Sequence, residues 1–182
     1  SKQPFFDAVF FNNKNDLNPD PRNEKVSGFE LGYGFTSNNF TANVNFYRTQ
    51  WRDRFIRVSY EDEATGDEGF ADIQGVEQLH TGIELDFTYD LSDKFRLVGM
   101  ASVGDWEYSG NVSGTAFDDV DPVGLVNLYL DGVKVGNSAQ TTARLGFDWD
   151  VTDNFEIDYS HRYAARLYAD INTEDFQDEV NN

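Results

Sequence analysis

Three short polar turns divide this chain at nearly even intervals, and each joins two segments in which apolar and polar residues alternate. The turns occupy residues 36–39, 92–94 and 152–154, roughly 60 residues apart, and a phenylalanine follows each of them directly. An aromatic residue also lies one to three positions before each turn. Tight turns alternating with long connections, with aromatic residues beside the tight turns, are typical of a transmembrane β-barrel wall.

The alternation itself predicts strands with one apolar face. In residues 29–35, four apolar side chains occupy every second position, and Glu30 and two glycines separate them. The same period recurs in four other segments: residues 40–46, 83–89, 143–149 and 155–159. A period of two places each apolar set on one face of a strand. The segment after the second turn is less regular, because Val98 and Met100 lie opposite Phe95 and Leu97.

The polar face carries full charges deep inside the predicted strands, at Glu84, Asp86, Glu156 and Asp158. Charges there suit a water-filled lumen, and the strands reach the roughly 9–11 residues that cross a bilayer with tilt. A soluble β-sandwich or a lipocalin-like barrel also alternates, and it is the alternative fold. We predict an all-β chain whose antiparallel meander forms part of a transmembrane β-barrel wall.

Composition limits the other options. The chain has no cysteine, which excludes disulfides and thiolate metal sites. It contains no run of 18 apolar residues, so we expect no transmembrane helix. The formal net charge of -19 argues against nucleic acid as a partner, because phosphates require lysine and arginine.

Acidic residues cluster in three places: residues 61–69, 118–121 and 170–179. We interpret these clusters as solvated loops. Calcium binding is the alternative, since oxygen-rich flexible loops suit that ion. The first cluster lacks the pattern of an EF-hand loop, and the sequence leaves any metal site unknown.

We expect three hairpins, at about residues 24–52, 75–108 and 139–170, after an irregular segment at residues 1–23. The tight turns should face the periplasm, and long loops at residues 53–74 and 109–138 should face outside. Within the second loop, residues 125–130 followed by Asp131-Gly132 predict a short strand and a turn. Six spanning strands are too few to close a barrel, and no signal peptide opens the sequence. We therefore expect a piece of a longer wall.

The outer end of the first hairpin is the candidate ligand-binding segment. Residues 47–54 combine aromatic groups with three arginines in a chain that is short of positive charge. Continuing the alternation places Tyr47, Thr49, Trp51 and Asp53 toward the lumen. We expect Tyr47 and Trp51 to lie near a ligand that is anionic, planar or sugar-like. The alternative is an aromatic belt with arginines reaching the interface, as at any barrel rim.

Several segments resemble one family. Residues 17–33, from Leu-Asn-Pro-Asp to Phe-Glu-Leu-Gly-Tyr, resemble the "L-x-P-E … E-x-G" segment of TonB-dependent outer-membrane receptors, with Asp20 in place of glutamate. Residues 40–54 resemble the strand that returns from it, and residues 75–86 the next strand, with its "G-x-E" signature. Arg-Leu-Tyr-Ala-Asp at residues 166–170 is similar to a strand ending in such receptors from Bacteroidota-like bacteria.

The resemblance implies a barrel of about 22 strands in the outer membrane of a Gram-negative bacterium, with its lumen closed by a plug. It also implies energised import of a scarce ligand, such as an iron chelate, a vitamin or a glycan. The partners would be outer-membrane lipid, this ligand and an inner-membrane TonB-type protein that pulls the plug. The plug is missing from these residues. The alternative function is a non-transport barrel or a soluble β-sandwich binding module.

Catalytic chemistry finds little support in the sequence. His80 and His161 lie roughly 80 residues apart on predicted strands, where lumen or interface roles are usual. No phosphate-binding glycine loop, nucleophile elbow or His-Glu-x-x-His motif occurs. We expect a protein that is not an enzyme and needs no cofactor. An outer-membrane barrel protease or lipase is the alternative.

Overall fold

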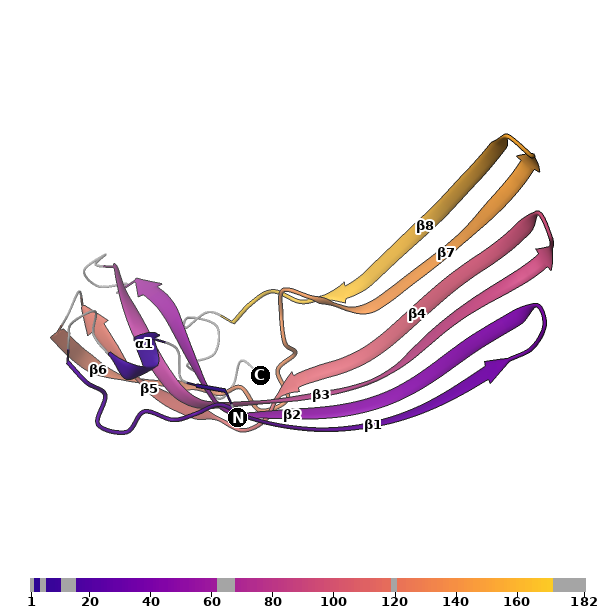
Figure 1. The fold of residues 1–182 in the computed structure, drawn as a ribbon. Helices are drawn as coiled ribbons and strands as arrows, with labels where there is room; N and C mark the ends of the chain where they lie inside the picture. Colours follow the sequence, from indigo (N-terminus) through magenta and orange to yellow (C-terminus); the bar gives the residue numbers. More distant parts are fainter. Residues whose placement is uncertain (1, 4–5, 11–15, 62–67, 119–120, 172–182) are drawn as a thin grey trace.

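The computed structural model describes residues 2–3, 6–10, 16–61, 68–118 and 121–171, and nearly all of its regular structure is one antiparallel sheet (Figure 1). A short helix, α1 (Phe6–Val9), precedes the strands. The strands are β1 (Lys25–Thr36), β2 (Phe40–Glu61), β3 (Glu68–Ser92), β4 (Phe95–Tyr108), β5 (Val112–Asp118), β6 (Asp121–Leu128), β7 (Ala139–Thr152) and β8 (Phe155–Leu167). The order across the sheet is β1-β2-β3-β4-β7-β8, and β5 pairs with both β3 and β6.

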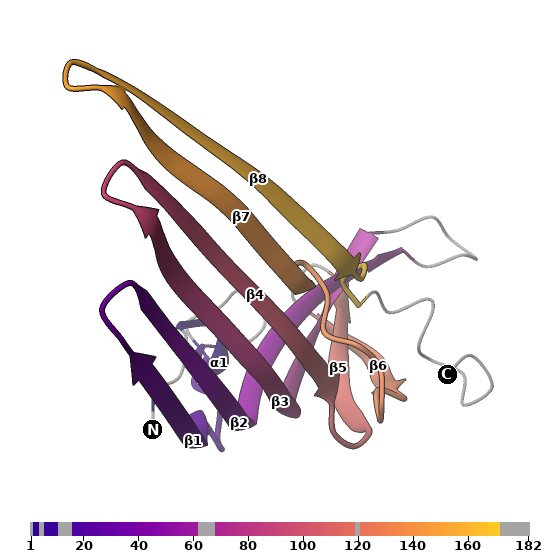
Figure 2. The ribbon, with the colours of Figure 1, turned by 90° about the vertical axis from the view of Figure 1, so that its right-hand side faces the viewer.

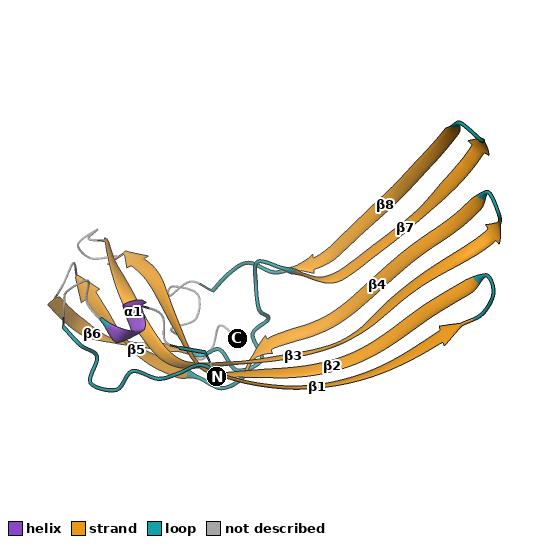
Figure 3. Ribbon diagram, viewed as in Figure 1, coloured by secondary structure: helices purple, strands orange, loops and turns teal. Residues whose placement is uncertain are grey.

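The predicted meander is confirmed, and its tight turns gather at one end of the sheet. β1–β2, β3–β4 and β7–β8 are hairpins closed at residues 36–40, 92–95 and 152–155. Figures 1 and 3 show the three turns side by side, with the longer connections at the opposite end. Figure 2 shows the six long strands lying next to one another in a curved wall. None of the described helices has the length and apolar character needed to span a bilayer.

One face of the wall, here called the outward face, is apolar across all six strands. Strand register aligns Leu31 with Phe46, Val44 with Leu85, and Gly99 with Leu145. These side chains lack a second layer to cover them, since Leu31 is 64% and Leu145 57% exposed. A β-sandwich would bury this face against another sheet. A single sheet with an uncovered apolar face instead fits a membrane barrel wall, whose outward side chains contact lipid.

The opposite face, here called the lumen face, is polar. Asn43 donates its side-chain amide to the carboxylate of Asp86 at 2.9 Å, from the neighbouring strand. Toward the tight turns, Asp148 lies opposite Asp158 in the register of β7 and β8. Such groups need water, so the two faces of the wall require different solvents.

The expected long loop at residues 53–74 is wrong for most of its length. β2 continues to Glu61, and β3 begins at Glu68. The pairing shifts at the point where the loop was expected, between Trp51 and Arg54. There Asp53 has a positive φ of 56° and Gly75 one of 87°, so a β-bulge takes the place of a chain reversal.

The expected loop at residues 109–138 also contains two strands, β5 and β6. The predicted short strand is present, although β6 spans residues 121–128 rather than 125–130. The turn at Asp131-Gly132 follows it, with Gly132 at a φ of 80°. Beyond the wall, β5 and β6 join the distal parts of β2 and β3 in an outer extension, defined here as residues 54–61, 68–77, 112–118 and 121–135.

The outer extension has a water-excluding core of its own. Ile73, Val76, Leu128 and Leu130 are fully buried, and Tyr108 at the end of β4 is 5% exposed beside them. Val133 and Val135 pack against this cluster. Burial of this kind stabilises a sheet in water, in contrast to the exposed apolar face of the wall.

The N-terminal segment is held against the outer extension. The side-chain amide of Asn18 donates to the carbonyl oxygen of Ala8 at 2.9 Å and to the side chain of Gln74 at 3.1 Å. Glu24, buried at the start of β1, lies 3.6 Å from the ammonium of Lys2 and 3.8 Å from Nε of Arg54. The motif that leads into β1 thus anchors the segment where the wall meets the extension.

Candidate ligand-binding site

Strand register gathers ring side chains on the lumen face near the outer end of the wall. Thr49 of β2 lies opposite His80 of β3, and His80 lies opposite Trp106 of β4. Two and four residues along β3 from His80, Gly82 and Glu84 face Tyr47 and Asn45 of β2. The lumen hollow defined by this arrangement has a volume of about 400 Å³. Its lining residues are Glu30, Asn45, Tyr47, Thr49, Trp51, His80, Glu84 and Trp106.

Both residues named from the sequence, Tyr47 and Trp51, line this hollow together with Thr49. Asp53 does not join them, although the alternation predicted that it would. The bulge turns Asp53 away, and its carboxylate accepts a hydrogen bond from Lys25 at 2.6 Å. This ion pair and the nearby Arg22 hold the pKa of Asp53 below its ordinary value.

Two glycines make room for the rings to lie close to the sheet. A Cβ atom at Gly82 would collide with the phenol ring of Tyr47. One at Gly104 would lie 2.6 Å from Nε1 of Trp106. Both glycines therefore leave the space in which the rings of Tyr47 and Trp106 lie against the sheet.

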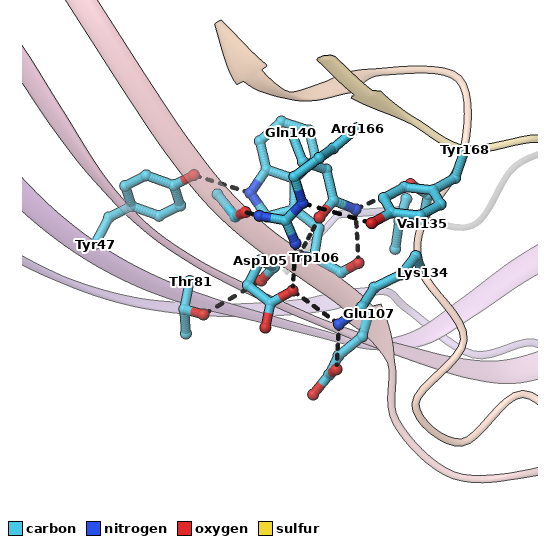
Figure 4. A network of polar contacts seen from close by, with 11 residues as sticks. Tyr47, Thr81, Asp105, Trp106, Glu107, Lys134, Val135, Gln140, Arg166 and Tyr168 are labelled. Carbon is cyan, nitrogen blue, oxygen red and sulfur yellow. Dashed lines mark hydrogen bonds and ion pairs between the residues drawn. The ribbon is translucent and has the colours of Figure 1, made fainter.

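The rings contact one another directly. The imidazole of His80 stacks on the indole of Trp106, with centroids 5.2 Å apart and planes 13° apart. Nε1 of Trp106 donates a hydrogen bond to the Tyr47 hydroxyl at 2.8 Å (Figure 4). Across the hollow, the guanidinium of Arg54 lies 5.4 Å from the ring centre of Trp51. Contacts among the side chains thus fix the aromatic surface.

Behind Trp106, Gln140 takes the place of a strand partner. The backbone N–H of Trp106 donates to Oε1 of Gln140 at 3.1 Å, and Nε2 of Gln140 donates back to the Trp106 carbonyl oxygen at 2.9 Å. The same amide also reaches the carbonyl oxygen of Val135 at 3.2 Å. Gln140 is only 1% exposed, so water does not compete for these hydrogen bonds, and they hold the backbone of Trp106 in place.

Charged groups brace the same rim from the other side of Trp106 (Figure 4). The ammonium of Lys134 lies 2.8 Å from the Asp105 carboxylate and 3.0 Å from that of Glu107. The hydrogen bond to Asp105 is the main cause of the raised pKa of Lys134. Arg166, which has a positive φ of 57°, donates to the Gly104 carbonyl oxygen at 2.9 Å. This network ties β4, the connection before β7 and the end of β8 into one support.

The arginines of residues 47–54 separate by face. Arg48 lies opposite Phe29 in the register and belongs to the outward face, as does Arg52 four residues further on. Only Arg54 reaches the lumen face, where it donates to the side chain of Gln78. The lining of the hollow itself contains two carboxylates, Glu30 and Glu84, and no lysine or arginine.

Sequence reasoning missed five members of this site: Glu30, Asn45, His80, Glu84 and Trp106. Alternation alone places each on the polar face of its own strand. Which of them meet depends on the register between strands, and a single strand pattern does not contain that information. The other histidine, His161, lies opposite Leu145 on the outward face.

A second hollow, about 380 Å³, lies in the outer extension between Asn18, Phe55 and Phe117. Three of its polar side chains already have partners: Asp72 pairs with Arg57 at 2.5 Å, and Gln74 accepts a hydrogen bond from Asn18 at 3.1 Å. The lumen hollow is therefore the stronger candidate site. In the described part of the chain, no group of three or more histidine or acidic residues could hold a metal ion. The first acidic cluster lies mostly outside the described residues.

An uncovered apolar outward face, a polar lumen face and an aromatic hollow on the latter define the wall of an outer-membrane β-barrel. Residues 3–181 match the family TonB dependent receptor-like, beta-barrel. The chain belongs to this family of outer-membrane receptors and transporters, as its motifs suggested. Comparison with curated proteins and with solved structures found no match.

Proposed function

We propose that this chain forms the outer, ligand-binding part of the wall of a receptor that captures a scarce small molecule and imports it. The observation that carries this proposal is the lumen hollow, where four ring side chains converge near the outer end of the wall. Concave sites lined by rings and a few polar groups are typical of small-molecule binding. An iron chelate, a vitamin or a glycan fits the nutrient role of such a receptor.

The edges of the sheet support a place within a larger barrel. β1 and β8 are the outermost strands, and each pairs on one side only. An unpaired strand edge cannot face the hydrocarbon of a membrane, because its backbone groups would lack partners. We therefore expect further strands to close the wall into a barrel that outer-membrane lipid surrounds. Import would be driven by a TonB-type inner-membrane protein that acts on a plug inside the barrel.

The test uses the intact receptor in its own membrane. A strain that lacks the receptor and its complemented parent are grown on media in which iron chelates, vitamins and glycans limit growth in turn. The medium on which only the complemented strain grows identifies the ligand class. A receptor with both Tyr47→Ala and Trp51→Ala should then fail to restore growth on that medium, while its barrel assembles normally.

The matched control is Tyr33→Ala, which removes an aromatic ring from the outward face of the same hairpin, where Tyr33 is 71% exposed. This variant should restore growth as the parent does. Normal growth of the double variant, with normal amounts of assembled receptor, would remove the lumen hollow from the binding site. Growth that does not depend on the receptor in any medium would contradict import.

A further inference from the structure

The lumen hollow combines aromatic rings with carboxylates that have no internal partner. Glu30 projects from β1 and Glu84 from β3, on opposite sides of β2. Within the described part of the chain, neither carboxylate forms an ion pair or a hydrogen bond, and both are exposed. Two carboxyl groups with spare hydrogen-bond acceptors thus border one ring surface.

A cation beside the hollow, Arg54, is already engaged. Arg54 contacts Trp51 through its guanidinium, donates to Gln78 and lies 3.8 Å from the buried carboxylate of Glu24. It is not part of the lining. The stack of Trp51 and Arg54 also shows that a ring of this site accepts a cation on its face.

The surroundings extend the same sign of charge. Asp86, two residues from Glu84 on the lumen face of β3, is acidic, and the chain carries a formal net charge of -19. The lumen-face arginines Arg144 and Arg162 lie beyond β4, on β7 and β8. An anionic ligand would enter this region against repulsion, whereas a cation would be attracted along the lumen face. Aromatic faces and carboxylates together also satisfy both halves of an organic cation, its charge and its apolar body.

We propose that the lumen hollow selects a positively charged organic ligand, bearing a protonated amine or a guanidinium, over neutral and anionic molecules of the same size. The inference rests on the proposed function and specifies the ligand class for the same site. Glu30 and Glu84 pair with the cationic group, and the rings of Tyr47, Trp51 and Trp106 contact the body of the ligand. The amine can belong to a free small molecule or to a basic side chain of a peptide.

The test measures affinity in the purified intact receptor with probes of one shape and different charge: protonated 2-phenylethylamine, neutral 2-phenylethanol and anionic phenylacetate. Cellobiose serves as a carbohydrate probe, and a short lysine-containing peptide distinguishes the two sources of amine. The protonated amine should bind about tenfold more tightly than the alcohol. Its advantage should shrink as salt is added, because screening weakens the charge interaction.

Single variants locate the effect. Glu30→Gln and Glu84→Gln should each weaken binding of the amine about threefold to tenfold and leave the alcohol unchanged. The control is Asp86→Asn, which removes the same charge from the same face outside the hollow. It should weaken binding of the amine less than either glutamate variant does and leave the alcohol unchanged. Equal losses from all three variants would mean that only the general charge of the lumen acts, and would overturn the proposed pairing.

Other outcomes separate this inference from the proposed function. Phenylacetate or cellobiose as the tightest probe, with binding lost in Trp51→Ala, would overturn the cationic ligand and keep the hollow as the binding site. Binding that persists unchanged in Trp51→Ala would place the probes elsewhere and contradict both. Absence of binding by every probe would overturn the charge selectivity, while the growth test would still decide import.

Discussion

Glycine 82 determines how closely Tyr47 can lie against the sheet. Its missing side chain leaves the space that the phenol ring occupies, and the Tyr47 hydroxyl in turn accepts the hydrogen bond from Trp106. A methyl group at this position has no free volume. Gly82 therefore sets the position of Tyr47 and, through the hydrogen bond, that of Trp106.

We predict that Gly82→Ala displaces the Tyr47 ring and breaks its hydrogen bond to Trp106, because the added Cβ overlaps the ring. The cost should be about 1–3 kcal/mol of stability, as for other overpacked sites, and ligand affinity should fall. Unfolding in lipid vesicles and probe titration of the intact receptor measure the two effects. Gly28→Ala is the control, since its Cβ would meet Thr49 at an ordinary 3.4 Å. Equal behaviour of both variants would contradict the prediction.

Asp53 offers a prediction with a pH dependence. Its pKa is lowered, chiefly by the hydrogen bond from Lys25, so the folded state favours the ionised carboxylate. The stabilisation is therefore present above the ordinary pKa of 3.8 and is lost as the pH falls through the lower folded value. Asp53→Asn should be less stable than the parent near neutral pH, and the difference should vanish in acid. A difference that is constant with pH would assign the effect to the bulge geometry instead of the charge.

At the scale of strands, the wall should tolerate charge on its lumen face, which contacts water, and not on its outward face, which contacts lipid. Leu85 and Leu145 lie on the outward face, whereas Asp86 follows Leu85 directly and lies on the lumen face. Leu85→Arg and Leu145→Arg should each cost about 2–4 kcal/mol if the positions lie near the bilayer midplane. Refolding of the intact receptor into vesicles measures the cost.

Asp86→Arg is the matched control, because the lumen face already accommodates the adjacent pair Arg144 and Arg162. It should refold with a much smaller loss. Comparable damage from Leu85→Arg and Asp86→Arg would mean that both faces are dry, which is incompatible with a barrel wall.

The hairpins and their faces were predictable from the sequence, because lipid on one side and water on the other impose a strict period of two. The outer extension was not. The acidic stretch of the sequence at residues 61–69 includes the end of β2 and the start of β3, and the bulge at Asp53 shifts the alternation, so the pattern resembles a solvated loop. The lumen hollow was predictable only in part, since Tyr47 and Trp51 follow from one strand. His80 and Trp106 join them through cross-strand register.

At the scale of the whole molecule, topology makes a further prediction. The tight turns should face the periplasm and the outer extension should face outside the cell. Most of the first acidic cluster, residues 62–67, lies outside the described residues, and the outer label is therefore placed at Gly124 of β6, whose Cβ position is open. In whole cells expressing the intact receptor, a cysteine at Gly124 should react with an impermeant maleimide, and one at Asp93 should not. Equal labelling of both positions would reverse or abolish this orientation.

The outer extension affects how the receptor unfolds. β2 and β3 continue from the wall, whose apolar side chains face outward toward lipid, into the outer extension. There the apolar side chains around Ile73 and Leu128 are buried. Loss of the surrounding bilayer removes the partner of the wall and leaves the outer extension intact. β2 and β3 each thus belong to two cooperative units, the wall and the outer extension. Unfolding of the wall can end at the bulge formed by Asp53 and Gly75, with the outer extension still folded.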